Sequence, residues 1–330
     1  MRYNNYHKHT HYSNIKTLDC ISKPEDYIKR AVELGHTTYF TTEHGFQGNI
    51  YEAHTLCEQY GLKCIFGVEA YYVDDMYDKS SRSNYHLMLV AMNDNGRKEI
   101  NKIMSLANTD GFYYKPRIDL KCLLSLTPTD VVVTTACVAS RMFKEKIVEE
   151  FNTDKIIGYE KKKIPIRVGN DNLSWDWKET DEDDLTKPIY EKIQVQTKGS
   201  WLNDFLIPVH NHFGKNFYLE VQNHNEPVQI EHNRKLLKVK EKYGIQLIHA
   251  NDSHYIYPED AKYRDLFLNA KGMYYEDESN FILDYPDSDT IVERYRIQGV
   301  LNDEQIKEAL DNTLIFDNAE SIKLDKEFKI

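Results

Sequence analysis

Pairs of potential metal ligands occur at alternate positions in two distant segments of the chain. His7 and His9 lie near the start, and Asp252 and His254 lie towards the other end. On a β-strand, residues i and i+2 point to the same face, so each pair would converge on one point. Imidazoles and carboxylates can bind the same divalent metal, so the two pairs predict a buried metal cluster and hence a chemical site.

Short apolar runs alternate with amphipathic stretches before residue 152 and again after residue 215. We expect strands over 3–9, 37–42, 63–73, 85–91, 131–135, 216–222 and 245–251. We expect helices over 24–34, 49–60, 95–107, 140–151, 227–243, 258–271 and 302–316. This alternation predicts an α/β fold built on a parallel sheet or barrel.

Further side chains of the metal-ligand type fall at or near the ends of these strands. They are His44, Glu69, His86 and Cys137, with Glu43 beside His44. Any one of them alone is more often a satisfied structural residue than a ligand. Most of them, however, sit at the strand ends that carry the site of a βα barrel. The joint pattern therefore predicts a multinuclear site with nitrogen, oxygen and sulfur ligands.

The segment 152–200 interrupts the alternation. It contains the basic run 161–163 and the acidic run 181–184. Charge runs are more often solvated faces than binding sites. We therefore expect a polar insertion, a small hairpin or a flexible loop, within one domain that spans 1–330.

Composition limits the classes of function. The chain has 42 basic and 53 acidic residues and a net charge of −11, which argues against nonspecific nucleic-acid binding through a broad basic surface. The 24 tyrosines could stack on bases, although such aromatics mostly lie at the edge of a core. The five cysteines form no C-x-x-C pair, no apolar run is long enough to cross a membrane, and the start is not a secretory leader. We expect a cytoplasmic location with reduced thiols and no membrane partner.

The chain resembles the PHP (polymerase and histidinol phosphatase) family. It is most similar to the N-terminal PHP domain of bacterial C-family replicative polymerases, the alpha subunit of DNA polymerase III. The matching strings are His7-Lys8-His9-Thr10 with Tyr12-Ser13, Thr42-Glu43-His44-Gly45, Gly67-Val68-Glu69, His86-Leu87, Gly111-Phe112-Tyr113-Tyr114-Lys115-Pro116-Arg117, Ala136-Cys137, Phe217-Tyr218-Leu219-Glu220 and Asn251-Asp252-Ser253-His254-Tyr255. They cover most of the chain except the 152–200 insertion and the C-terminal tail. The strings at 111–117 and 136–137 favour the polymerase branch over the small-molecule phosphatases.

The resemblance implies a distorted (β/α)7 barrel with up to three divalent metal ions (zinc, manganese or iron) at the C-terminal strand ends. The implied ligands of the first ion are His7, His9, Glu69 and Asp252, which would also be the catalytic set. Glu69 would bridge to a second ion held by His86 and Cys137, and Asp19, His44 and His254 would hold a third. His11 is the alternative to Asp19, because the segment before Asp19 is longer than in the family. Glu43 is expected to support the ligands rather than bind metal.

The implied reaction is metal-assisted phosphodiester hydrolysis, in which divalent ions activate water and offset charge on the phosphate oxygens. The implied substrate is the 3′ end of a DNA strand, in single-stranded form, cut by a 3′→5′ exonuclease that could proofread. Lys115, Arg117 and Arg141 are candidate phosphate contacts, and Tyr113 and Tyr114 could stack on bases. Structural roles for these five residues are an equally good interpretation.

Two other functions are compatible with the same residues. The metals could only stiffen a module that docks a DNA polymerase or another replication protein, or the site could hydrolyse a small phosphomonoester. A complete polymerase of this kind would continue for hundreds of residues and include a separate catalytic domain. We therefore expect an excised domain or a free-standing relative, bacterial or encoded by a phage in a bacterial host.

Overall fold

The computed structural model describes residues 1–15, 19–142, 148–167, 175–196, 201–270, 272 and 281–324. The chain divides into two compact units, Met1–Lys144 with Trp201–Ile330, and Glu145–Ser200. Each unit is described below by itself.

The larger unit is built on a six-stranded mixed sheet with the strand order β10-β9-β6-β4-β3-β5. Its strands are β3 (Gly67–Tyr72), β4 (Tyr85–Ala91), β5 (Arg117–Ile118), β6 (Val131–Thr134), β9 (Phe217–Val221) and β10 (Leu247–His249). The β10–β9, β9–β6 and β3–β5 pairs are parallel, whereas β4 runs antiparallel to both β3 and β6. A separate parallel pair is formed by β1 (Thr38–Phe40) and β2 (Lys63–Ile65).

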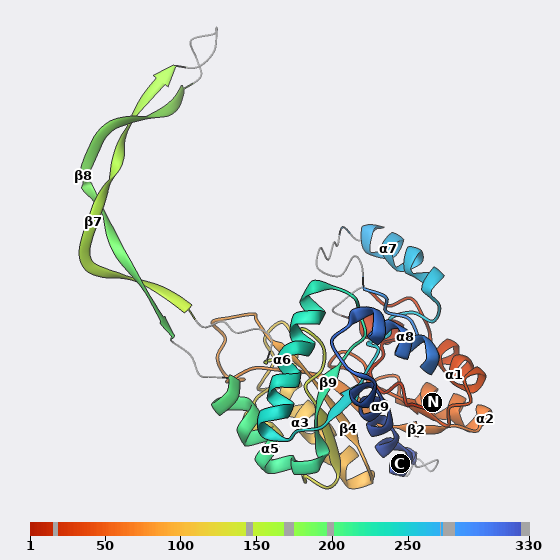
Figure 1. Cartoon of the computed structure of the whole chain (residues 1–330). Helices are drawn as coiled ribbons and strands as arrows, with labels where there is room; N and C mark the ends of the chain where they lie inside the picture. Colours follow the sequence, from red (N-terminus) through yellow and green to blue (C-terminus); the bar gives the residue numbers. More distant parts are fainter. Residues whose placement is uncertain are drawn as a thin grey trace. The chain divides into compact units, whose positions relative to one another are not determined.

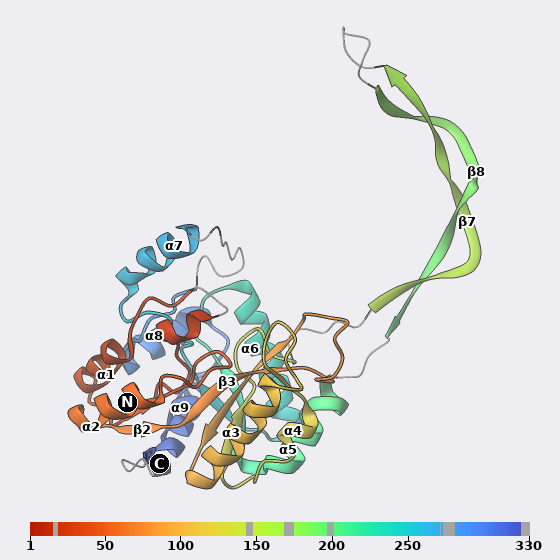
Figure 2. The same ribbon diagram turned by 180° about the vertical axis from the view of Figure 1, so that it is seen from behind.

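Helices pack against the outside of these strands (Figure 1). They are α1 (Pro24–Glu33), α2 (Ile50–Tyr60), α3 (Asp94–Asn108), α4 (Leu120–Leu123), α5 (Ile207–Phe213), α6 (Pro227–Tyr243), α7 (Ala261–Ala270), α8 (Ser288–Gln298) and α9 (Asp303–Asn312). Short helical turns are η1 (His11–Ile15), η2 (Leu202–Leu206), η3 (Gly214–Asn216), η4 (Pro258–Asp260) and η6 (Thr313–Asn318). Helix α3 contacts β4 and β5, α6 contacts β9, and α9 contacts β10. The same arrangement is seen from behind in Figure 2.

Side chains on both faces of the central strands are buried, which accounts for their continuous apolar character. All positions of β3, β6 and β9 are buried, and Leu87, Leu89 and Val133 belong to the main hydrophobic core. Strands that are buried on both faces are expected to be apolar throughout rather than alternating. The predicted α/β class is confirmed.

The strand pairs among the described residues do not establish the predicted closed (β/α)7 barrel. The predicted strand over 3–9 is wrong, because this extended segment makes only one isolated bridge, between Lys8 and Ser253. The hydroxyl of Thr42 donates to the carbonyls of Tyr6 and Lys8, and a side chain thereby replaces a strand partner. This segment therefore lies beside the sheet without a ladder of its own.

The predicted helix over 140–151 is also wrong where the structure describes it. Residues 143–147 lie outside the described part of the chain, and residues 148–151 belong to a strand. Lys271, the last residue of the predicted helix over 258–271, is outside the described residues as well.

The smaller unit contains an antiparallel pair, β7 (Val148–Arg167) and β8 (Trp175–Gln196). Its described side chains are mostly exposed, among them Trp177, Leu185 and Ile157. Three lysines at positions 161–163 form ion pairs with Asp183, Glu182 and Glu179 at 2.9, 2.9 and 3.3 Å. The segment predicted as a polar insertion thus holds a long hairpin with charged cross-strand pairs.

None of the described helices has the length and apolar content that a membrane crossing requires. The five cysteines are all free thiols.

Candidate metal centre

The extended N-terminal segment brings His7 and His9 beside the loop that follows β10. The backbone N–H of His9 donates to the carbonyl of Ser253 at 2.7 Å, and the N–H of Ser253 donates to the carbonyl of His7 at 3.2 Å. Asp252 therefore lies between the two imidazoles. Its φ of 52° is in the left-handed region, where Asp is one of the few residues other than Gly that is found with any frequency.

Four buried side chains converge at this point. The Oδ1 atom of Asp252 lies 3.1 Å from His7 Nε2 and 3.2 Å from His9 Nε2. The carboxylate of Glu69, on β3, lies 3.3 Å from each of the same two nitrogens. These are the four residues that the sequence predicted for the first ion.

Glu69 also contacts a second group of ligand-type residues. Its Oε1 atom lies 2.9 Å from His86 Nδ1, on the neighbouring strand β4. The Sγ atom of Cys137 lies 3.7 Å from the same nitrogen. Cys137 follows Ala136, whose φ of 55° turns the chain sharply after β6. One carboxylate is thus shared between two groups of ligand-type atoms, as a bridging ligand would be.

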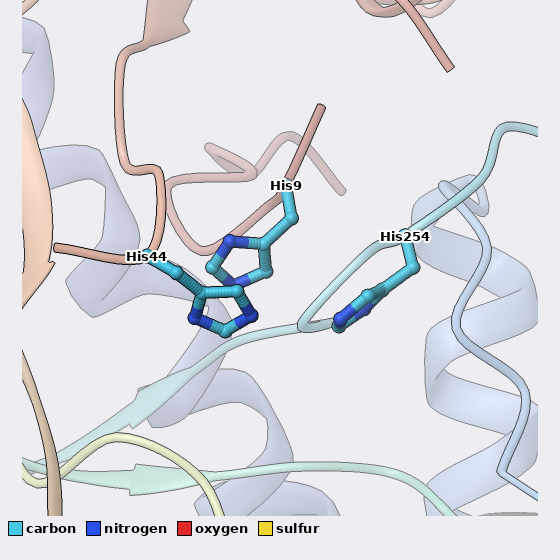
Figure 3. Close-up of side chains that lie close together, drawn as sticks. All are labelled: His9, His44 and His254. Carbon is cyan, nitrogen blue, oxygen red and sulfur yellow. The ribbon is translucent and has the colours of Figure 1, made fainter. Parts of the chain in front are cut away.

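A third group lies on the other side of His9. The rings of His9 and His44 stack with centroids 3.8 Å apart, and the His254 ring lies 4.9 Å from His9 (Figure 3). His44 Nδ1 contacts Glu69 Oε2, and His254 Nε2 lies 3.2 Å from Asp19 Oδ2. Asp19 therefore lies next to the cluster. His11, the alternative to Asp19, is exposed and packs on Tyr12.

The buried polar atoms of this cluster fit a set of metal ions. His7 Nε2, His9 Nε2, His44 Nδ1, both carboxylate oxygens of Glu69 and Asp252 Oδ1 make no hydrogen bond to any described residue. Buried polar atoms without partners cost about 1–3 kcal/mol each, so a fold rarely keeps several of them together. Imidazole, carboxylate and thiol donors at this spacing are ligands for divalent cations.

Two carboxylates that do not belong to the ligand groups hold the histidines in place. Glu220, on β9, accepts from Tyr6 and Thr134 and lies 2.7 Å from His7 Nδ1. This contact leaves His7 Nε2 facing Asp252 and Glu69. The sequence string that contains Glu220 matched the family, but its spacing gave no sign of this role.

Glu43 holds the loop after His9. It accepts hydrogen bonds from the backbone and hydroxyl of Thr10, from Ser13 and from Asn49. Ser13 in turn lies 3.1 Å from His9 Nδ1. The expectation that Glu43 supports the ligands agrees with these contacts.

The charges in the cluster act strongly on one another. Burial alone would lower the pKa of His7, but the charges of Asp252, Glu220 and Glu69 raise it well above its ordinary value. Burial opposes ionisation of Glu69 and Asp252, yet the neighbouring histidines hold the pKa of each carboxyl well below its usual range. Burial and the nearby carboxylates raise the pKa of the Cys137 thiol. Binding of a cation through this thiol would therefore release a proton.

Lys115, a predicted phosphate contact, lies over an aromatic ring that packs on the cluster. Its Nζ atom lies 4.1 Å from the centre of the Tyr71 ring, and Tyr71 stacks on His44 and meets His86 edge-on. The predicted stacking residues are on the same loop: Tyr114 is 48% exposed with Arg82 over its ring, and Tyr113 packs against Tyr114.

Two predicted phosphate contacts do not fit that role. Arg117 is 1% exposed, and its guanidinium donates to the carbonyls of Gly111, Met76 and Ser81. Arg141 is buried and forms a two-point ion pair with Asp74 at 2.8 and 3.2 Å. Both cations serve the fold, because their N–H groups are already bound by the protein.

Residues 5–166 match the family model of the PHP domain. The resemblance to the PHP family is confirmed. The matched residues include the ligand-type side chains from His7 to Cys137, whereas Asp252 and His254 lie beyond them.

Curated relatives of this chain are bacterial and phage DNA polymerases. It is 28% identical to the DNA polymerase III subunit alpha of Aquifex aeolicus, over 81% of this chain and 19% of the relative. The corresponding subunit of Borreliella burgdorferi is 27% identical, over 79% and 19%. A DNA-directed DNA polymerase of Bacillus phage SPbeta is 27% identical, over 94% and 23%. The chain spans about a fifth of the length of these relatives.

A solved structure of a metal-dependent phosphoesterase from Bifidobacterium adolescentis aligns with 88% of the chain at 14% identity and a TM-score of 0.38. This similarity is too low to establish a common fold.

Proposed function

We propose that the chain is a metal-dependent phosphoesterase of the polymerase branch, acting as a 3′→5′ DNA exonuclease. The observation that carries the proposal is the convergence of buried nitrogen and oxygen atoms from His7, His9, His44, Glu69 and Asp252, which lie within 3.3 Å of one another in His–carboxylate pairs but form no hydrogen bond of good geometry with any described residue. A purely structural polar cluster would be expected to satisfy its own hydrogen bonds. The relatives named above, which are DNA polymerases, support DNA as the substrate class.

Up to three divalent ions would be held by the three groups. The first would be bound by His7, His9, Glu69 and Asp252, the second by Glu69, His86 and Cys137, and the third by Asp19, His44 and His254. Zinc, manganese and iron all suit such mixed ligands. Ions of this kind lower the pKa of bound water and offset charge on a phosphodiester.

The chain's own residues prepare the ligand atoms for this role. Glu220 beside His7 Nδ1 keeps the proton of that ring on the side away from the cluster. His254 Nδ1 lies 2.8 Å from the backbone carbonyl of Asp252, so its Nε2 atom faces Asp19. Both rings are thus oriented before any ion binds.

The substrate in this proposal is the 3′ end of single-stranded DNA. Lys115 would contact a phosphate beside the cluster, and Tyr113 and Tyr114 would stack on bases. A DNA polymerase or another replication protein is the proposed partner, because the relatives are polymerases of which this chain spans about a fifth.

The test is cleavage of a 5′-labelled single-stranded oligonucleotide with added manganese, with and without a chelator. We expect stepwise shortening from the 3′ end that the chelator abolishes. Asp252→Asn should slow it by at least about a hundredfold, since a metal ligand is lost. Asp303→Asn, which changes an exposed carboxylate on α9 in the same way, should cleave at the wild-type rate.

Equal rates for the wild type and Asp252→Asn would contradict this site. No shortening by protein shown to carry its metals would favour a metal-stabilised module that docks a polymerase. Release of phosphate from a small phosphomonoester, without DNA cleavage, would favour the phosphatase alternative.

A further inference from the structure

A second set of buried polar atoms without partners lies after β9, outside the ligand groups. His224 is 3% exposed and Asn223 is 2% exposed. Both ring nitrogens of His224 and the amide nitrogen of Asn223 make no hydrogen bond to any described residue. The metal-site proposal uses neither residue, so their unsatisfied atoms require another explanation.

These two residues lie close to the metal centre. They follow β9 by a few residues, as Asp252 and His254 follow β10, and the two strands are parallel neighbours paired at Val221 and His249. The ends of neighbouring parallel strands meet at one edge of a sheet. Consistent with this, the charges of Asp252 and His254 act on the His224 ring, whose pKa burial lowers to about 4.

The loop is held rigidly by buried amides. Gln298, on α8, donates to the carbonyls of Gln222 and His224 at 3.1 and 2.6 Å. Asn233, on α6, donates to the carbonyl of Gln222 at 2.8 Å and to the side chain of Gln298 at 2.8 Å. Buried amides on two helices therefore fix the backbone of this loop at Gln222 and His224.

A cavity of about 330 Å³ opens beside the loop. It is lined by four consecutive residues of this loop, 223–226, and by Ile282, Arg294 and Ile297. Ile282 and Ile297 are 44% and 62% exposed, and the ring of Phe281 lies 4.7 Å from that of His224. Residues with amide and imidazole side chains therefore line the cavity together with apolar ones.

The charges of the cavity favour a neutral ligand over a phosphate. Arg294 is neutralised by Asp284 through a two-point ion pair at 2.6 and 2.8 Å. Glu226 adds a negative charge to the lining, which would repel an anion. A planar, uncharged group with polar edges fits both the apolar side chains and the unsatisfied amide and imidazole.

We propose that this cavity binds the base of the 3′-terminal nucleotide and thereby positions the adjoining phosphodiester at the metal centre. The ring faces of the base would pack on Ile282, Ile297 and the guanidinium plane of Arg294. The nitrogen atoms of Asn223 and His224 are shielded from solvent, so these two side chains would rotate towards the cavity to hydrogen-bond to the edge of the base. This subsite rests on the proposed exonuclease, and recognition of a displaced base by such groups is a general means of reading nucleotides.

The first experiment measures binding without turnover. Deoxyadenosine, which has no phosphate to bind metal ions, is titrated into the metal-loaded full chain by calorimetry. We expect His224→Ala and Ile297→Ala each to weaken binding about tenfold, the scale of one base contact. Ile297 is exposed on its helix, so its truncation tests the cavity even if His224→Ala fails to fold. Leu106→Ala, which truncates a 37% exposed side chain on α3, should bind as the wild type does.

The second experiment compares two oligonucleotides that differ only at the 3′ terminus, one with a normal nucleotide and one with an abasic residue. We expect wild-type protein to cleave the normal end faster and both cavity variants to lose about tenfold of this preference. Nucleoside binding that depends on the cavity, with no cleavage of any DNA, would support the subsite and overturn the exonuclease. Cleavage that ignores the base, or nucleoside binding that neither variant changes, would overturn the subsite and leave the exonuclease standing.

Discussion

At the scale of single residues, His7 lies between carboxylates with different tasks. Asp252 and Glu69 face its Nε2 atom, and Glu220 lies beside its Nδ1 atom. Only the first two were predictable from the sequence, because they belong to strings of ligand-type residues. The role of Glu220 depends on its hydrogen bonds from Tyr6 and Thr134. These residues are distant in the sequence and meet Glu220 only in the folded chain.

We therefore predict that Glu220→Gln weakens metal binding about 10–100-fold, because the His7 ring loses the group that orients it. Competition against a chromophoric chelator measures the affinity. Glu308→Gln, which removes a partly buried carboxylate paired with Lys240 outside the ligand groups, serves as the control and should bind metal normally. Equal affinities for all three proteins would mean that Glu220 has no part in orienting His7.

A buried histidine outside the metal centre should make stability depend on pH. Burial lowers the pKa of His36 to about 4, and its Nδ1 atom lies 2.7 Å from the Tyr285 hydroxyl. Its unfolded pKa is about 6.5, so the neutral ring favours the folded state above that pH. Protonation progressively removes this stability as the pH falls from about 6.5 to about 4.

The measurement is the free energy of unfolding of the wild type minus that of His36→Gln. We expect this difference to fall by up to about 3 kcal/mol between pH 7 and pH 4. Subtraction cancels the titration of the metal ligands, which both proteins share. A difference that stays constant across this range would show that His36 ionises alike in the folded and unfolded chain.

At the scale of elements, the sequence predicted helices with clear end signals best. The helix over 24–34 has Pro24 at its start, and the helix over 49–60 stops at Gly61, whose φ of 74° lies in the left-handed region that favours glycine. The prediction of a strand failed where side chains, rather than a neighbouring strand, bind the backbone polar groups. The 3–9 segment looks like a strand, but Thr42 and Ser253 take up its polar groups.

The prediction of the site from alternating ligand-type residues assumed that each pair lies on a β-strand, and this assumption was wrong. Neither His7 with His9 nor Asp252 with His254 lies on a strand. Both pairs sit in extended or left-handed backbone whose course is fixed by bonds between the two segments. The segments lie more than two hundred residues apart, and no local pattern encodes such pairing.

Arg117, the first residue of β5, provides a test of its revised role. We predict that Arg117→Met destabilises the chain by about 3 kcal/mol, because three backbone carbonyls lose a charged donor in a buried place. Chemical denaturation measures the change. Arg296→Met removes an exposed ion pair to Asp303 and should cost less than about 0.5 kcal/mol. Comparable stability of the two variants would return Arg117 to the candidates for substrate binding.

At the scale of the whole molecule, the two units differ in how they are stabilised. Neither cluster of buried apolar residues includes a member between 145 and 200 among the residues described. The hairpin relies instead on its backbone ladder and on exposed ion pairs, which contribute little in water. We infer that the larger unit carries its own stability.

Replacement of Glu145–Ser200 by a short Gly/Ser linker tests this inference. We expect the shortened chain to melt within a few degrees of the full chain and to bind the same number of metal ions. Calorimetry and metal analysis of the purified protein give the two readouts. Loss of cooperative melting would mean that the hairpin stabilises the larger unit.

The left-handed backbone at Asp252 has an evolutionary consequence. Asn is among the few other residues that tolerate a φ of 52°, and one G-to-A transition converts either aspartate codon into an asparagine codon. A lineage could therefore lose this carboxylate ligand in a single step without disturbing the loop. Mutation at this position can thus remove the metal ligand while the fold remains. We therefore expect drift to produce descendants that keep the domain but have lost its activity.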